Sequence, residues 1–273
     1  MNINSKFLLL GTSLSLIPNL LYAQCSPAQS CAELGYKETS NKGGCLKCPF
    51  GNGWYCPEPK EEKAVLGQCT GYAKNCKIGQ ILNNDGTCTN DVTAGKTPIA
   101  VVVYISNEGC GQAITAKSIA QEIYWGEAGV DIPELENHED INDYDSCQNT
   151  KKIIYAGWDY PAARAAKNYV PDNAAATKDK WCLPAVGVLA SLSQNLNAVN
   201  AGIYKLGGTQ IREYIDGEEF LWSSTEGEAW TAWAYWPSGG ASGIGLVLNG
   251  KDGKRGTGNA SDGVFAVRPV IEF

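Results

Sequence analysis

The sequence predicts an α+β fold that follows a small, loop-dominated module rich in cysteine. Cysteine is unevenly distributed, with eight of the eleven residues lying between Cys25 and Cys88. An apolar, β-branched run occupies residues 99–105, helical signals fill the middle of the chain, and short apolar runs separated by Gly, Ser and Asn continue from Phe220 onward. One strand, then helices, then a group of strands is the order of an α+β domain, whose two ends can meet in one sheet.

The first 23 residues predict a secretory signal peptide. Lys6 is the only charge ahead of an apolar stretch that is too short to span a bilayer and that ends at Ala23. A membrane anchor is the alternative, but no further apolar run of about 20 residues appears. A lipid anchor requires a small residue immediately before the modified cysteine, whereas Gln24 precedes Cys25. We therefore expect cleavage after Ala23 and a protein without a transmembrane segment that is secreted, periplasmic or exposed on the cell surface.

Residues 24–95 are the predicted cysteine-rich module, and residues 96–273 are the predicted main domain. Eight cysteines in an exported stretch with few large apolar side chains indicate up to four disulfides, because covalent loop closure then replaces a hydrophobic core. Their pairing does not follow from the sequence. Cys45 and Cys48 have the spacing of zinc ligands, but they lack a second close pair and a nearby histidine, so disulfides are favoured over metal. The eight cysteines are Cys25, Cys31, Cys45, Cys48, Cys56, Cys69, Cys76 and Cys88.

Three further cysteines lie in the main domain and make the total of eleven odd. At least one cysteine must therefore be free or pair outside the chain. We expect a disulfide between Cys147 and Cys182, with Cys110 left over.

Within the main domain, residues 99–105 form a continuous apolar run between turn-forming residues, which predicts a buried strand. Gly95-Lys96-Thr97 looks like the end of a phosphate-binding loop, but Asn90 stands where the first glycine is required, so no such loop is predicted. Helices are expected at residues 149–156, 161–169, 184–192 and 196–206, and later strands at residues 220–222, 229–236, 244–248 and 264–273.

Six short motifs follow one another in the main domain. They are Asn149-Thr150 with Ile153-Ile154, Tyr160-Pro161-Ala162-Ala163, Trp181-Cys182-Leu183-Pro184, Trp222-Ser223-Ser224-Thr225-Glu226, Ala229-Trp230, and Val267-Arg268-Pro269-Val270. In this order they resemble a domain family of bacterial surface proteins that includes the C-terminal domain of the collagen-like adhesin Lcl. That family belongs to the C-type-lectin-like superfamily, and the resemblance covers about residues 97–273. It implies a domain whose N- and C-terminal strands pair, two flanking helices, a loop-rich binding surface, and adhesion or ligand recognition outside the cytoplasm.

Several motif residues are expected to maintain the fold. Trp181 and Trp222 are predicted core residues, because a buried indole removes a large area from water. Arg268 lies in an otherwise apolar terminal strand and needs a carboxylate or carbonyl partner. We expect Glu226 to be that partner.

The best candidate for a binding surface is the aromatic segment at residues 230–236. Alternation along a strand places Trp230 and Trp236 on one face, and Trp233 and Tyr235 on the other. A sheet edge near a surface rarely buries aromatic side chains on both faces, so one set is a candidate platform for a sugar ring or a protein partner. The alternative is that loops cover both faces.

The composition argues against catalysis and against several ligands. His138 is the only histidine. A histidine-based catalytic triad is therefore not favoured, and a metal site with several histidine ligands cannot form within one chain. The formal net charge is −7, and it becomes −8 once Lys6 leaves with the signal peptide, so nucleic acid is an unfavourable partner. Residues 140–145 are oxygen-rich but lack EF-hand spacing, and the usual calcium-dependent sugar motifs are absent, so no cofactor is expected. Calcium is the alternative, because Asn249, Asp252, Asn259 and Asp262 lie in glycine-rich turns that could converge on an ion.

We therefore expect an exported, non-catalytic surface or envelope protein that recognises a glycan or a protein ligand in the manner of an adhesin. A structural component of a surface assembly and an unrecognised hydrolase are the alternatives. The sequence leaves the oligomeric state open.

Overall fold

The chain divides into two compact units, residues 1–62 and residues 63–273. The computed structural model describes residues 63–127, 129–133, 135, 141–157, 159–211, 219–229, 231–235, 244–247 and 264–273, and the short strands β1 (Leu46–Lys47) and β2 (Trp54–Tyr55). Those two strands pair with each other in antiparallel fashion. The expected signal peptide and five of the cysteines, Cys25, Cys31, Cys45, Cys48 and Cys56, lie outside the described residues.

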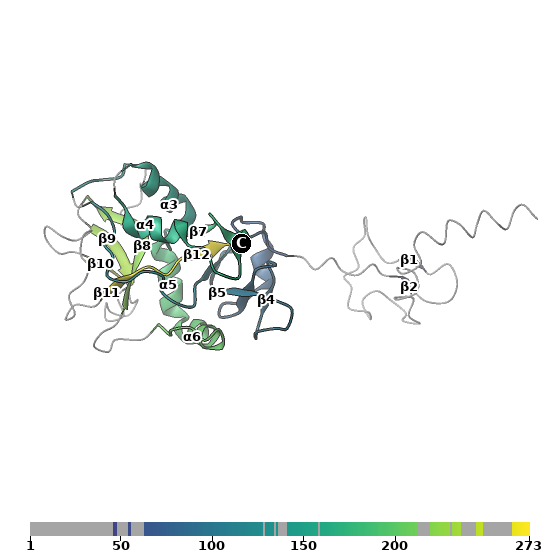
Figure 1. The fold of residues 1–273 in the computed structure, drawn as a ribbon. Coiled ribbons are helices and arrows are strands. Elements are labelled where there is room, and N and C mark those ends of the chain that lie inside the picture. Colours follow the sequence, from purple (N-terminus) through teal and green to yellow (C-terminus); the bar gives the residue numbers. More distant parts are fainter. Residues whose placement is uncertain are drawn as a thin grey trace, which may run out of the picture. The chain divides into compact units, whose positions relative to one another are not determined.

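The larger unit is built on a six-stranded sheet with the strand order β4-β3-β5-β6-β12-β7. Its central strand β5 (Pro98–Ile105) covers the run for which a buried strand was predicted. The last strand, β12 (Val270–Glu272), lies antiparallel between β6 (Gly111–Ile114) and β7 (Trp181–Cys182). The end of the chain thus lies in the same sheet as β5, as Figure 1 shows near the C-terminus.

Both faces of this sheet are covered by apolar groups, which explains why β5 is apolar at successive positions. Val101 and Val103 belong to a cluster with helices α5 (Val186–Gln194) and α6 (Leu196–Lys205). Ala100 and Val102 point the other way, into a cluster formed with residues 64–76. The same alternation continues on β6, β12 and β7.

Residues 63–95, which the sequence placed in the cysteine-rich module, contribute to this sheet. They supply the short helix η1 (Tyr72–Asn75), β3 (Ile81–Asn83) and β4 (Cys88–Thr89), and β3 pairs directly with β5. Ile81 and Leu82 are fully buried. The division between the two compact units therefore falls after residue 62, whereas the sequence suggested residue 95.

A second, four-stranded sheet has the order β10-β9-β8-β11. Strands β8 (Glu219–Glu228), β9 (Thr231–Tyr235) and β10 (Ile244–Val247) are antiparallel neighbours, and β11 (Val264–Ala266) runs parallel to β8. Helices α3 (Ser146–Tyr155) and α4 (Pro161–Asn168) share an apolar cluster with one face of β8, β9 and β11. A further short helix, η2 (Ala175–Thr177), precedes β7. This mixture of sheets and helices confirms the predicted α+β class.

Three disulfides staple the larger unit. Cys147 is bonded to Cys182, as the sequence suggested, and Cys76 is bonded to Cys88. The expectation that Cys110 is left over is wrong, because Cys110 is bonded to Cys69. The two lie 41 residues apart in sequence, and they meet because residues 63–76 pass beside the turn that joins β5 to β6.

These bonds bear on where the protein resides. Disulfides form and persist in oxidising compartments, so the three bonds indicate a location outside the cytoplasm. Among the helices that the structure describes, none has the length and apolar character needed to cross a membrane.

Candidate functional site

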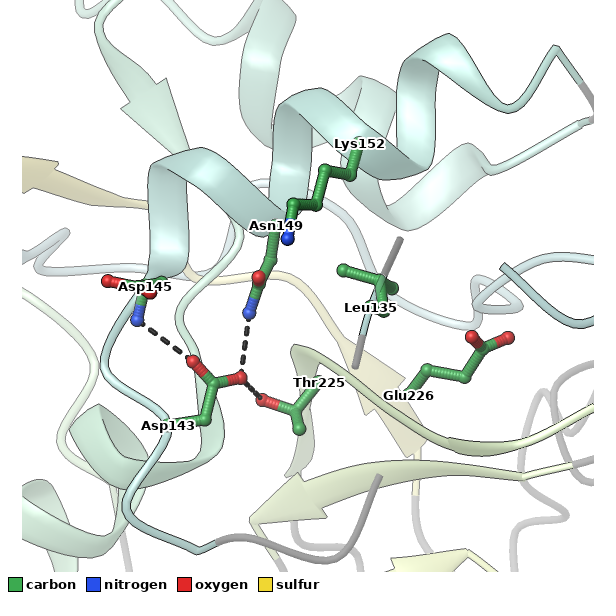
Figure 2. A pocket seen from close by; sticks show the side chains of 7 residues that line it. All are labelled: Leu135, Asp143, Asp145, Asn149, Lys152, Thr225 and Glu226. Carbon is green, nitrogen blue, oxygen red and sulfur yellow. Dashed lines mark hydrogen bonds between the residues drawn. The ribbon is translucent and has the colours of Figure 1, made fainter. Parts of the chain in front are cut away.

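A small polar pocket lies between the N-terminal part of α3, the loop that precedes it, and β8 (Figure 2). Its volume is about 90 Å³, which is room for a few water molecules or one small polar group. The lining residues are Leu135, Asp143, Asp145, Asn149, Lys152, Thr225 and Glu226.

Asp143 organises this pocket. The residue is 9% exposed, and its carboxylate accepts three hydrogen bonds, from the Asp145 backbone N–H at 2.9 Å, from the Asn149 side-chain amide at 2.7 Å and from the Thr225 hydroxyl at 2.6 Å. The Thr225 hydroxyl in turn accepts the backbone N–H of Val186 at 3.0 Å. One carboxylate therefore fixes the loop before α3, α3 itself, β8 and the start of α5 relative to one another.

A second group of buried hydroxyls extends the same network. The Ser146 hydroxyl donates to the Gln112 side chain at 2.6 Å and accepts the Ala185 backbone N–H at 2.7 Å. The Thr150 hydroxyl donates to the Ser146 carbonyl at 2.7 Å and accepts the Leu183 backbone N–H at 3.0 Å. Because the irregular segment 183–186 has buried backbone groups that no strand or helix satisfies, these side chains serve a structural purpose.

The remaining charged groups of the pocket do not converge on one point. Figure 2 shows Asp145 and Glu226 pointing to opposite sides of Asp143. Glu226 is 1% exposed and accepts the Ile132 backbone N–H at 3.0 Å, whereas Asp145 is exposed at the start of α3. In the part of the chain that the structure describes, no group of three His, Cys, Asp or Glu residues could hold a metal ion. The pocket is thus arranged for hydrogen bonding to a polar group.

Tyr160 lies beneath the loop that carries Trp125 and contacts this indole edge-on, with ring centroids 5.6 Å apart. The side chain is fully buried. Burial raises the pKa of Tyr160 to about 12, and the nearby charges of Glu226 and Glu127 add to the effect. The hydroxyl therefore stays protonated at physiological pH.

The two tryptophans expected in the core are both fully buried. The Trp181 indole N–H donates to the Thr177 hydroxyl at 3.0 Å, and the Trp222 indole N–H donates to the Ile123 carbonyl at 2.7 Å. Trp222 also stacks on Phe265, with ring centroids 4.2 Å apart. Each indole thus has a partner for its N–H and an apolar contact for its ring.

Arg268 is fully buried, as its place in a terminal strand suggested. Its guanidinium donates to the Ser118 hydroxyl at 3.1 Å and to the Thr209 carbonyl at 2.6 Å. Glu226 accepts the Ile132 backbone N–H, and its pairing with Arg268 stays a prediction. Ser118 and Thr209 come from irregular segments 150 and 59 residues away in the sequence, where no pattern points to them.

The aromatic segment is only partly described. Trp230 and Trp236 lie outside the described residues. Trp233 is half-buried against the cluster that contains α5, and Tyr235, at 2% exposed, belongs to that cluster. Ala232 and Ala234 face the opposite cluster. Both faces of β9 therefore pack against apolar groups, which favours the alternative that this strand is covered on both sides.

Sequence reasoning missed the central role of Asp143 and Ser146. Asp143 had been weighed only as one of several oxygen-rich residues that could bind calcium. A single aspartate placed before a helix gives no periodic signal, and the residues that it joins lie up to 82 positions away.

Comparison with known proteins provides no family assignment. No protein-family profile matches the chain, and no curated protein matches it. Among solved structures, a fimbrial protein from Bacteroides ovatus is similar with a TM-score of 0.48 and 13% sequence identity. The match covers 72% of this chain and 49% of that one, so the chain spans about half the length of the fimbrial protein. The function must therefore be argued from the site.

Proposed function

We propose that the protein is an exported, non-catalytic binding protein of the C-type-lectin-like class that recognises a glycan or a protein ligand. The observation that carries this proposal is the preformed polar pocket whose walls Asp143 fixes by three hydrogen bonds. Groups held rigidly before a ligand arrives bind it at a lower entropic cost than mobile groups do. The three disulfides support a role outside the cytoplasm.

The arrangement of strands and helices supports the proposed class. The resemblance implies that the first and last strands of the domain share one sheet and that helices flank it. In the larger unit β12 pairs with β6, β6 pairs with β5, and α5 and α6 cover one face. Four motif residues, Asn149, Thr150, Leu183 and Thr225, take part in the buried network that joins α3, β8 and segment 183–186.

In this proposal, Asp145 and Lys152 contact the ligand at the pocket. Asp145 is exposed and Lys152 is half-buried, so both can be reached from solvent. A carboxylate and an ammonium group on the wall of one pocket offer both an acceptor and donors, which suits hydroxyl and amide groups. Sugar rings and polypeptides both carry such groups.

A specific observation favours a second candidate, a structural component of a surface assembly. All six cysteines of residues 63–273 are paired within that unit. Five cysteines remain among residues 1–62, and an odd number cannot be fully paired within one chain. A covalent link to another envelope protein would use the remaining thiol.

A binding screen of the full exported chain separates these candidates. The chain is applied to a glycan array and used to capture envelope proteins, alongside the variants D145N and K152Q and the control Y204A, which changes an exposed residue of α6. We expect one ligand class to bind, the pocket variants to weaken binding about tenfold, and the control to bind as the parent does. An empty array together with captured proteins that require a free cysteine would overturn the first candidate in favour of the second.

A further inference from the structure

Residues 63–76, called the strap below, form an irregular cover over one face of the six-stranded sheet. Its side chains Ala64, Leu66 and Ala73 are at most 8% exposed and pack on an apolar surface. The sheet supplies that surface through Ala100, Val102, Ala113, Trp181, Ile271 and Phe273. Only the four residues of η1 are helical, so most of the strap has no hydrogen bonds of its own secondary structure.

The described backbone hydrogen bonds between the strap and the rest of the unit are three. The Gly67 N–H donates to the Glu272 carbonyl at 2.6 Å, the Ala73 N–H donates to the Gly109 carbonyl at 3.0 Å, and the Ala64 N–H donates to the Gly86 carbonyl at 3.0 Å. Gly109 and Gly71 approach so closely that a Cβ atom on Gly109 would lie 2.6 Å from the Gly71 carbonyl oxygen. The strap therefore meets the β5–β6 turn at a tight crossing.

Two disulfides tie the strap down at different places. Cys76–Cys88 fixes its C-terminal end to β4, and Cys69–Cys110 fixes its middle to the β5–β6 turn. In the described part of the chain, Cys69–Cys110 is thus the covalent bond that holds residues 63–75 against the sheet. Without the Cys69–Cys110 bond, residues 63–75 would be joined covalently to the unit only by the backbone that leads into Cys76.

The disulfides also differ in their access to solvent. Cys69 is exposed and Cys110 is half-buried. Cys76 is 6% exposed and its partner Cys88 is half-buried, whereas Cys147 and Cys182 are 9% and 4% exposed, so Cys69 is the one exposed residue among these six cysteines. Thiol–disulfide exchange requires that a thiolate reach one sulfur of the bond, so an exposed disulfide reacts before buried ones.

We propose that Cys69–Cys110 is an exchangeable lock on the strap, opened by a dithiol reductant of the cell envelope. One thiolate of the reductant attacks the Cys69 sulfur, forms a mixed disulfide with it, and releases Cys110 as a thiolate that takes up a proton. The second thiol of the reductant then closes its own disulfide and releases Cys69 as a thiol. Two electrons pass from the dithiol to the cysteine pair.

Opening the lock loosens the strap and uncovers the apolar surface beneath it. Cys76–Cys88 continues to hold β4 beside β3, and Cys147–Cys182 continues to hold α3 beside β7. The rest of the sheet therefore stays intact while Val102, Ala113 and Phe273 become accessible.

The experiment is a graded reduction of the full exported chain with dithiothreitol. Thiols are trapped with N-ethylmaleimide at each concentration and located by peptide mapping. We expect Cys69 and Cys110 to become labelled at a reductant concentration at least tenfold below that required for Cys76, Cys88, Cys147 and Cys182. At that concentration, hydrogen exchange should accelerate at the amides of Gly67 and Ala73 and remain slow within β5.

Paired variants serve as the control. The double variant C69S/C110S should show fast exchange at Gly67 and Ala73 without any reductant, whereas C76S/C88S should keep these amides protected. If Cys76–Cys88 or Cys147–Cys182 opens first, or if the Gly67 and Ala73 amides stay protected after Cys69–Cys110 alone is reduced, the proposed lock is wrong. The peptide mapping of the parent chain decides the order of opening even where a variant fails to fold.

Discussion

The two faces of the six-stranded sheet bury similar apolar side chains, but they are covered by different kinds of structure. Helices α5 and α6 cover one face, and the irregular strap covers the other. A helix satisfies its own backbone groups and presents an apolar stripe, so its cover depends mainly on packing. The strap has few such bonds and depends on disulfides and on a small number of alanine and leucine contacts. The difference shows that a sheet can be sealed by covalent closure where the sequence offers no amphipathic element.

The largest expected effect comes from removing the strap together with β3 and β4. A chain that begins at residue 96, the boundary suggested by the sequence, lacks the strap, β3 and β4. It loses the buried side chains of Leu66, Ile81 and Leu82, which together contribute roughly 5–9 kcal/mol of burial free energy, comparable with the whole stability of a typical domain. We expect this chain to aggregate or remain unfolded by circular dichroism and size-exclusion chromatography.

The matched control for this truncation begins at residue 63. It keeps the strap, β3 and β4 and is expected to give a cooperative thermal transition. If the chain that begins at residue 96 is folded and monomeric, the sheet is stable without the strap, and this prediction is wrong.

This boundary illustrates what the sequence could and could not provide. The run at residues 99–105 was predictable because both of its faces are buried, so its apolar residues are continuous. The strap was not predictable because its buried residues Ala64, Leu66 and Ala73 follow no helical or strand period. The cysteines around them indicated a separate module instead.

The candidate site shows the same limit. Trp181 and Trp222 were assigned to the core because a large indole is buried in most settings. The hydrogen bonds of Arg268 to the Ser118 hydroxyl and the Thr209 carbonyl were not predicted, because no sequence pattern connects these distant loops to Arg268. Contacts of this kind appear only once the chain is folded.

The next effect compares one buried leucine on each face. Leu189 on α5 is fully buried, and Leu66 in the strap is 8% exposed. We expect L189A to lower the free energy of unfolding by about 3 kcal/mol, because the surrounding helices and strands cannot close the cavity. We expect L66A to cost only about 1–2 kcal/mol, because the irregular strap can shift into the vacated space. Urea unfolding of both variants measures the difference, and equal losses would mean that the strap is as rigid as the helices.

A smaller effect is expected at the network that joins α3, α5 and β8. D143N removes the negative charge that accepts hydrogen bonds from Asn149 and Thr225, and it places an amide donor against them. We expect a loss of about 2–3 kcal/mol in unfolding free energy. The neighbouring exposed variant D145N is the control and should change stability by less than about 0.5 kcal/mol. If D143N is as stable as D145N, the network does not hold the pocket walls together.

The smallest effect concerns Glu272, which lies on β12 and joins the strap to α3. Its backbone carbonyl accepts the Gly67 N–H of the strap, and its carboxylate accepts the Cys147 N–H of α3 at 3.4 Å. Burial raises the pKa of Glu272 above its usual 4.5, and nearby Asp145 adds to this, while the Cys147 N–H and Lys151 oppose it. A raised pKa in the fold means that the folded state binds the proton more tightly, so stability falls as pH rises from 4.5 through the folded pKa. E272Q removes this titration, so we expect its melting temperature to exceed that of the parent by about 1–2 °C at pH 7 and to match it near pH 4. The opposite result would contradict the raised pKa: the melting temperature of the parent would rise relative to that of E272Q between pH 4 and pH 7. Glu272 would then stabilise the fold as a carboxylate.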